Sequence, residues 1–200
     1  MPKLIGPLLL LVFCTGSLSA AHGKEGSNAI DIIELTIDKA HAAFREKRLT
    51  CQQLVGRYIT RIKTYDQPEH LNAIIYINPD AFKRAMELDR KFNSTGTLRR
   101  LHCVPVIVKD NIATQGMPTE AGSKALKGFI PKKDARIISL LRAEDAIILA
   151  KSNMDEWAFS PYHTISSTYG ETRNAYDSNI VPGGSSGGTA SAIAANLGLV

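Results

Sequence analysis

The chain has few cysteines, few aromatic residues and no dense run of basic side chains. Three cysteines among 200 residues are too few for a disulfide framework. None of them stands in a Cys-x-x-Cys pair or a Cys/His cluster of zinc spacing, so we expect no metal site. The 24 Lys and Arg against 19 Asp and Glu give a formal net charge of +5. Because these charges are scattered, they do not indicate nucleic-acid binding. The 44% hydrophobic and 22% charged residues are ordinary globular proportions, which exclude a disordered tail.

One apolar run near the N-terminus is too short to cross a membrane. It covers residues 4–14, follows Lys3 and precedes small and polar residues up to Ala21. This pattern is typical of a secretory signal peptide. We therefore expect a signal peptide over residues 1–21, no stable membrane anchor, and a secreted or periplasmic mature chain over residues 22–200. An apolar core segment in a cytoplasmic protein is the alternative. The sequence leaves open whether Cys51 and Cys103 of that mature chain pair.

Helices are predicted from apolar spacing and from capping residues. Apolar residues recur every three or four positions over residues 30–44, and the capping-box pattern of Thr50 and Gln53 opens a second helix. Asn78-Pro79 supplies an N-cap and a first-turn proline for a third helix, and Asp134 is the candidate N-cap of a fourth. A short helix is expected to begin at Asn153, and a further helix is expected within the small-residue run 183–195.

Strands alternate with these helices. Residues 104–108 and 146–150 are short apolar runs that predict buried strands, and residues 71–77 form another short segment rich in β-branched side chains. Alternating strands and helices indicate an α/β layered fold, and we expect one domain after the signal peptide.

A glycine- and serine-rich loop is the most informative segment. Gly183, Gly184, Gly187 and Gly188 surround Ser185 and Ser186, so the backbone can approach another group closely. The helix that follows can direct its first amides at negative charge. The segment is therefore a candidate active-site loop. A flexible turn and a phosphate-binding nest are the alternatives to that interpretation. A nucleophile elbow centred on Ser186 is disfavoured, because the preceding segment is short and ends in proline.

Lys109 lies at the end of the predicted strand 104–108, where α/β folds place their ligands. Partial burial would lower its pKa and make the amine a usable base. The alternative is a surface lysine paired with Asp110. Asp155 and Glu156 are interpreted as structural carboxylates in the first turn of a helix.

Taken together, these segments resemble the amidase signature family. The matching segments occur in the family's order and spacing: residues 101–111, 119–123, 151–156, 172–174 and the loop 183–188. The resemblance implies a mixed β-sheet core covered by helices on both faces, with further helices before it. It also implies an amide hydrolase that acts on a small-molecule amide and uses no cofactor and no metal.

The resemblance implies a Ser–cis-Ser–Lys triad that works through an acyl-enzyme. Lys109 is the implied general base, and Ser185, after a cis Gly184–Ser185 peptide bond, is the implied bridging serine. Gly183, Gly184, Ser186, Gly187 and Gly188 are the implied support of this loop. The family's attacking serine would fall near position 209, so no residue of this chain is the nucleophile. We therefore expect the N-terminal portion of an amidase, inactive by itself.

Two other functions stay open. The amidase subunit of glutamyl-tRNA amidotransferase has very similar motifs, but it is cytosolic and works with partner subunits. A truncated pseudoenzyme or an anion-binding module is the non-enzymatic alternative. The oligomeric state is open too. The chain departs from the family at Cys103 and Asp145, which replace a usual glycine, at Arg99-Arg100, which replace Gly-Pro, and at Ala175, which replaces proline.

Overall fold

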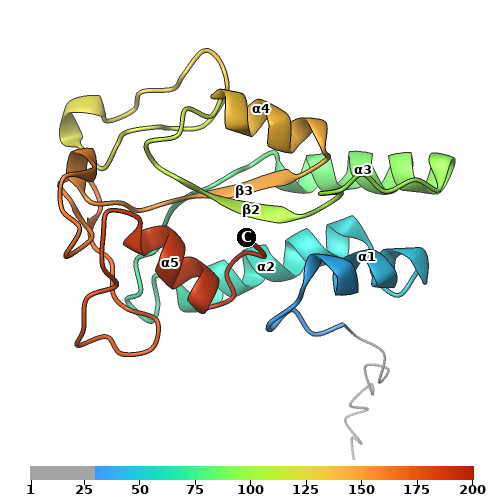
Figure 1. Ribbon diagram of the computed structural model, residues 1–200, viewed down its shortest axis with the longest axis horizontal. Helices are drawn as coiled ribbons and strands as arrows, with labels where there is room; N and C mark the ends of the chain where they lie inside the picture. Colours follow the sequence, from blue (N-terminus) through green and yellow to red (C-terminus); the bar gives the residue numbers. More distant parts are fainter. Residues whose placement is uncertain (1–29) are drawn as a thin grey trace, which may run out of the picture.

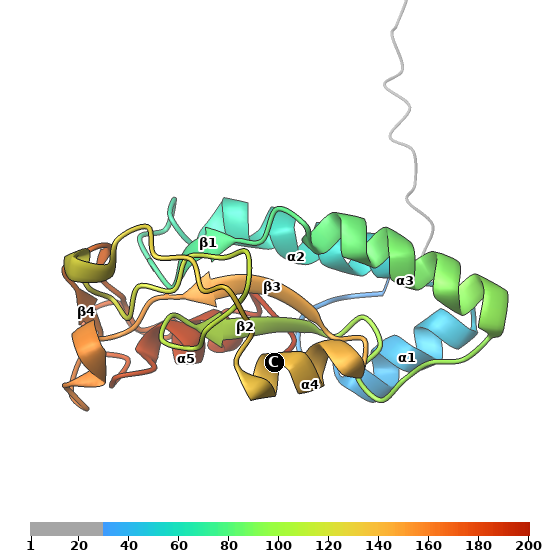
Figure 2. The same ribbon diagram turned by 90° about the horizontal axis from the view of Figure 1, so that it is seen from above.

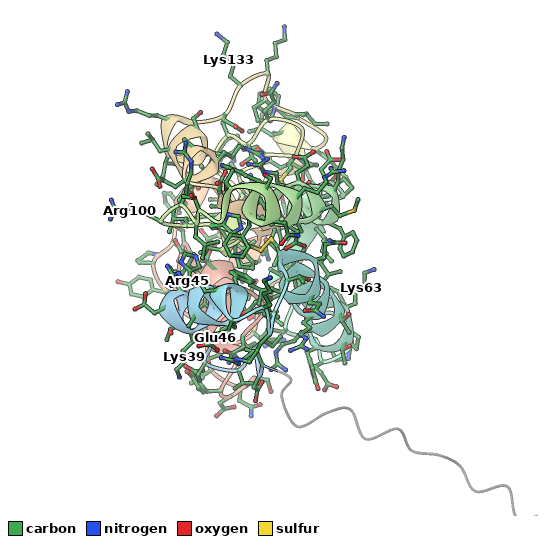
Figure 3. All side chains as sticks on the ribbon, turned by 90° about the vertical axis from the view of Figure 1, so that its right-hand side faces the viewer. Lys39, Arg45, Glu46, Lys63, Arg100 and Lys133 are labelled. Atoms are coloured by element: carbon green, nitrogen blue, oxygen red, sulfur yellow. A yellow bond between two sulfur atoms is a disulfide. The ribbon has the colours of Figure 1, made fainter. Side chains whose placement is uncertain are left out.

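The computed structural model describes residues 30–200, so the predicted signal peptide over residues 1–21 lies outside the described residues (Figure 1). Within residues 30–200, no helix combines the length and the apolar character that crossing a membrane requires. Lysines such as Lys39, Lys63 and Lys133 point outward from different parts of the molecule (Figure 3). The basic side chains are thus spread in space as they are in sequence.

The first two helices are α1 (Ile37–Arg45) and α2 (Cys51–Tyr65). The sequence predicted the start of α2 correctly but placed the start of α1 too early. The apolar spacing predicted a start near Ile30, but α1 begins later, because Glu34 has a left-handed backbone (φ 49°) and Thr36 is the N-cap. The capping box of α2 is confirmed. The Thr50 side chain accepts from the Gln53 N–H at 3.1 Å, and Gln53 returns a bond to the Thr50 N–H at 2.9 Å.

The two predicted capping residues, Asn78 and Asp134, differ in outcome. Helix α3 (Ala81–Thr95) follows Asp80, which makes no side-chain capping bond. The Asn78 side chain accepts from the N–H of Asp80 at 3.0 Å, as predicted for a cap, and also donates to the carbonyl of Ile148 at 2.7 Å. Helix α4 (Arg136–Ala143) begins after Ala135. Asp134 accepts from the Gln115 N–H at 2.7 Å and pairs with Arg142 at 2.9 Å, so its predicted capping role is wrong.

Three strands form the central sheet in the order β1 (Ile74–Ile77), β3 (Ile147–Ser152), β2 (Pro105–Lys109). Strand β1 runs antiparallel to β3, whereas β2 runs parallel to it, so the expected mixed sheet is present. A short hairpin, β4 (Ile165–Ser166) and β5 (Gly170–Glu171), lies apart from this sheet. Two 3-10 turns, η1 (Lys124–Leu126) and η2 (Glu156–Ala158), and helix α5 (Gly187–Ala194) complete the elements of residues 30–200. The short helix expected from Asn153 therefore begins three residues later.

Helices cover both faces of the sheet. Val106 and Val108 of β2 belong to the apolar cluster that contains Ile138 of α4, whereas Ile107 belongs to the cluster that contains Leu54 of α2 and Ala192 of α5. This alternation follows from the two-residue period of a strand. Figure 1 shows α4 on one side of β2 and β3, with α2 and α5 on the other. Helix α3 packs against α2 (Figure 2).

A disulfide joins Cys51 to Cys103 with a Cα–Cα distance of 5.6 Å, which answers the question that the sequence left open. Cys51 is the first residue of α2, and Cys103 lies just before β2. Both cysteines are buried. The bond therefore fixes the start of β2, the strand that carries Lys109, to the start of helix α2.

Replacing both cysteines with alanine should lower the free energy of unfolding by about 4 kcal/mol, because the bond constrains an unfolded chain over a separation of 52 residues. The measurement is urea unfolding of the oxidised chain, the chain in dithiothreitol, and the Cys51→Ala/Cys103→Ala variant. A Cys51→Ala/Cys103→Gly variant should recover about 1 kcal/mol, because the backbone of residue 103 is left-handed (φ 58°) and glycine adopts this conformation without strain. Equal unfolding midpoints for the oxidised and reduced chains would contradict the prediction.

Candidate active site

Lys109 and Ser185 come together although 76 positions separate them in the chain. Lys109 ends β2, opposite Ser152 of β3. Its Nζ donates to Ser185 Oγ at 2.6 Å and to Ser186 Oγ at 2.9 Å. The structure thus places the two predicted catalytic residues and the predicted supporting serine in one contact.

The charge state of Lys109 depends on two opposing effects. Burial lowers the pKa of Lys109 below the ordinary lysine value, and the negative charge of Asp155 raises it in part. A lower pKa increases the fraction of neutral amine at a given pH. A neutral amine at 2.6 Å from a hydroxyl can accept its proton, so the pair is arranged for general-base chemistry.

The Gly–Ser loop packs so closely on its neighbours that side chains are excluded. The Gly184–Ser185 peptide bond is cis, as the resemblance implied. A Cβ on Gly184 would lie 2.1 Å from the carbonyl oxygen of His163, and one on Gly187 would lie 2.3 Å from Thr164 Oγ1. A Cβ on Gly188 would lie 2.1 Å from the carbonyl oxygen of Asn153. Close approach, rather than flexibility, is therefore what these three glycines provide.

Two threonines hold the loop at its ends, and neither was predicted from the sequence. Thr164 Oγ1 donates to the carbonyl of Gly183 at 2.8 Å and accepts from the N–H of Gly187 at 3.0 Å. Thr189 Oγ1 lies 2.6 Å from Ser152 Oγ at the end of β3. Thr164 lies in a loop and Thr189 in α5, and neither carries a distinctive sequence signal, because the partners of each are set by the tertiary structure.

A second lysine, Lys151, is buried next to the turn that follows Lys109, and its structural role was not predicted from the sequence. Lys151 is fully buried, and its Nζ donates to the carbonyl of Ile112 at 2.9 Å and to Thr119 Oγ1 at 3.0 Å. Asp110 faces Lys151 at 3.9 Å, so the alternative pairing of Asp110 with Lys109 is wrong. Burial lowers the pKa of Lys151 to about 8. The lysine fixes the turn that follows Lys109 onto β3.

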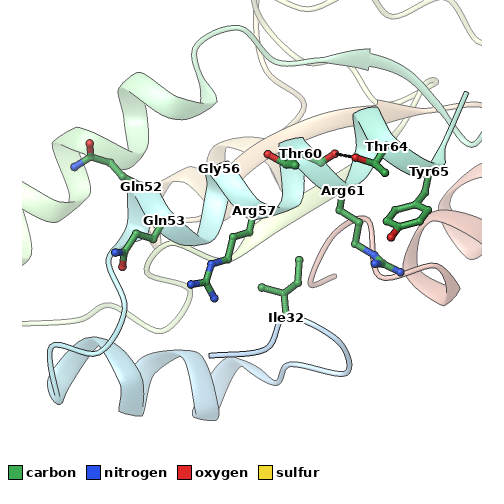
Figure 4. A pocket seen from close by; sticks show the side chains of 9 residues that line it. All are labelled: Ile32, Gln52, Gln53, Gly56, Arg57, Thr60, Arg61, Thr64 and Tyr65. Carbon is green, nitrogen blue, oxygen red and sulfur yellow. Dashed lines mark hydrogen bonds between the residues drawn. The ribbon is translucent and has the colours of Figure 1, made fainter. Parts of the chain in front are cut away.

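A hollow elsewhere on the surface lies away from the Lys109–Ser185 contact. A hollow of about 520 Å³ runs along α2, and Arg57, Arg61 and Tyr65 contribute to its lining (Figure 4). None of the predicted site residues lines it. In the part of the chain from residue 30 onward, no three His, Cys, Asp or Glu side chains gather as they would around a metal ion.

The model of the Amidase family matches residues 53–200. The chain belongs to the amidase family. Among its relatives is a glutamyl-tRNA(Gln) amidotransferase subunit of Clostridium acetobutylicum, 40% identical over 169 residues, which are 84% of this chain and 35% of that protein. The corresponding protein of Alkaliphilus metalliredigens is 41% identical over 83% of this chain and 33% of its own length.

Solved amidase structures share the fold. The native peptide amidase from Stenotrophomonas maltophilia superposes with a TM-score of 0.76 at 41% identity, over 82% of this chain and 35% of that one. An amidase family protein from Bacillus anthracis gives 0.78 at 34% identity, over 84% and 34%. The expected fold is confirmed. This amidase chain spans about a third of the length of the relatives it matches.

Substitution of Gly188 tests the close packing of the amidase loop. Gly188→Ala should destabilise the fold by about 3 kcal/mol, because its Cβ would meet main-chain atoms of Asn153 that cannot rotate away. Gly56→Ala in helix α2 is the matched control. Its nearest contact would be Phe82 at 3.9 Å, so alanine should stabilise that helix by about 0.5–1 kcal/mol. Urea unfolding of both variants is the measurement, and equal effects would show that packing against Asn153 is not the constraint.

Proposed function

We propose that this chain supplies the lysine and the bridging serine of an amide-hydrolysing site. The observation that carries the proposal is the 2.6 Å contact from Lys109 Nζ to Ser185 Oγ at the carboxyl end of β2. Neutral Lys109 takes the proton of the Ser185 hydroxyl, and Ser185 in turn takes the proton of an attacking serine. That serine forms an ester with the acyl part of the amide, the amine leaves with a proton, and water cleaves the ester.

The attacking serine belongs, on this proposal, to residues beyond Val200. The last described residues support it. Ile107 N–H donates to the Val200 carbonyl at 2.8 Å, and Leu199 N–H donates to the Pro105 carbonyl at 3.0 Å. This pattern pairs the chain end with the outer edge of β2 in the parallel direction. A chain that continues from Val200 would therefore run toward the end of the sheet where Lys109 lies.

The disulfide bears on the location of the mature chain. Disulfides persist mainly in oxidising compartments, and the Cys51–Cys103 bond therefore supports secretion or export to a periplasm. It agrees with the signal peptide predicted over residues 1–21. The alternative is a cytoplasmic amidotransferase subunit, which the similarity to glutamyl-tRNA(Gln) amidotransferase subunits favours. On that alternative, the chain would act with partner subunits and pass ammonia to a tRNA-bound substrate.

Amide turnover tests the proposed role of Lys109. The protein that carries residues 1–200 and whatever is encoded in frame after Val200 should release ammonia from small primary amides. Lys109→Ala should lower kcat/KM by about 100- to 10,000-fold, the usual contribution of a general base. Lys133→Ala, on an exposed loop, is the control and should leave turnover unchanged.

The 200-residue chain alone should show no turnover. Hydrolysis by that chain would place the nucleophile within it and contradict the proposal. Full activity of Lys109→Ala would remove Lys109 from the mechanism. Glutamine-dependent ammonia release that requires partner subunits, from a chain that stays reduced in the cytoplasm, would support the amidotransferase instead.

A further inference from the structure

Asp155 organises a segment that lies directly against the Gly–Ser loop. Its carboxylate is buried. Asp155 Oδ2 accepts from the N–H of Ser160 at 2.7 Å, and Oδ1 lies 2.8 Å from His163 Nδ1 and 3.4 Å from the N–H of Ile165. A buried carboxylate is stable only where polar groups surround it, and the two N–H donors and the imidazole beside Asp155 all come from residues 160–165. One side chain thus fixes the path of this segment.

Residues 160–165, which Asp155 fixes, also hold the Gly–Ser loop (residues 183–188). The carbonyl oxygens of Ser160 and His163 face the α-carbon of Gly184 so closely that a Cβ there would lie 2.5 and 2.1 Å from them. Thr164 Oγ1 bridges the carbonyl of Gly183 and the N–H of Gly187. Residues 160–165 therefore touch the loop on both sides of Ser185.

Asp155 also reaches the lysine–serine pair by two direct routes. Its main-chain N–H donates to the carbonyl of Ser185 at 3.1 Å, and Ser185 Oγ is the partner of Lys109. Its negative charge raises the pKa of Lys109 against the effect of burial. Position and proton affinity of the pair thus both depend on the same residue.

The interpretation of Asp155 as a structural carboxylate in the first turn of a helix does not account for these contacts. Asp155 occupies the N-cap position of η2, but its side chain makes no capping bond there. The neighbouring Glu156 points elsewhere and accepts from the N–H of Ser167 at 3.2 Å. Adjacent carboxylates therefore differ in role, and Glu156 is a matched control for Asp155.

We propose that Asp155 is a positioning residue for the lysine–serine pair, which holds Ser185 through residues 160–165 and through its own N–H. The proposal rests on the proposed function only in treating Lys109 and Ser185 as the working pair. It assigns Asp155 no contact with substrate.

The test follows Lys109 by NMR in the ¹³C-lysine-labelled 200-residue chain as the pH is raised, with Lys109→Ala to identify its signal. Asp155→Asn removes the charge, but its amide oxygen can still accept from the N–H of Ser160. We expect the titration midpoint of Lys109 to fall in Asp155→Asn and to stay unchanged in Glu156→Gln. An unchanged midpoint in Asp155→Asn, or an equal fall in Glu156→Gln, would overturn the proposal.

Amide hydrogen exchange measures the positioning itself. Asp155→Ala should speed exchange of the Gly187 N–H by about tenfold or more, because residues 160–165 lose their anchor, whereas Asp155→Asn should retain protection. If either Asp155 variant fails to fold, Thr164→Val removes the hydroxyl bridge without any change of charge and should speed the same exchange about tenfold. Unaltered exchange in Thr164→Val would show that the segment does not hold the loop. Neither the lysine titration nor the hydrogen exchange needs a substrate. A failure of this proposal can therefore be distinguished from a failure of the proposed amide hydrolysis.

Discussion

The parallel pairing of β2 with β3 determines where each part of the site lies. It places Lys109 opposite Ser152, whose hydroxyl contacts Thr189 of α5 at 2.6 Å. The chain that leaves β3 then meets the Gly–Ser loop by main-chain contacts, at Asn153 with Gly188 and at Asp155 with Ser185. Because successive side chains of a strand alternate between faces, a slip of one residue would carry Lys109 to the wrong face of the sheet. The register of one strand pair thus sets the whole arrangement.

Two lysines near the ends of these strands show how partners, more than burial, decide chemical role. Burial lowers the pKa of both Lys109 and Lys151. Lys151 donates to the carbonyls of Asp110 and Ile112 and to the Thr119 hydroxyl, and it faces the carboxylate of Asp110. The hydrogen-bond partners of Lys109 are two serine hydroxyls, which can donate as well as accept. Carbonyls and a carboxylate favour the ammonium form of Lys151, which holds the turn, whereas both partners of Lys109 can exchange a proton with its amine.

Local signals in the sequence predicted local structure well, and tertiary partners account for what they missed. The Thr50–Gln53 capping box is confirmed because both of its bonds lie within one turn of chain. The capping role of Asp134 was wrong because Gln115, distant in the sequence, supplies its donor. Composition and periodicity could not predict the contact between Lys109 and Ser185, because it depends on strand order and on the path of residues 160–165. Only the resemblance to a family predicted it.

The departures of this chain from the family's usual residues are linked in space. Cys103 and Asp145 both have left-handed backbones, with φ of 58° and 66°, which explains why glycine is usual at these positions. A residue with a Cβ costs about 1–2 kcal/mol in this conformation. Each side chain gains a partner in return: Cys103 bonds to Cys51, and Asp145 pairs with Arg84 and Lys91 of α3. The Cys103 N–H also donates to the carbonyl of Asp145 at 2.9 Å, so the two replacements lie at one junction. The two strained positions thereby link α2 to the start of β2, which carries Lys109, and α3 to the start of its partner strand β3.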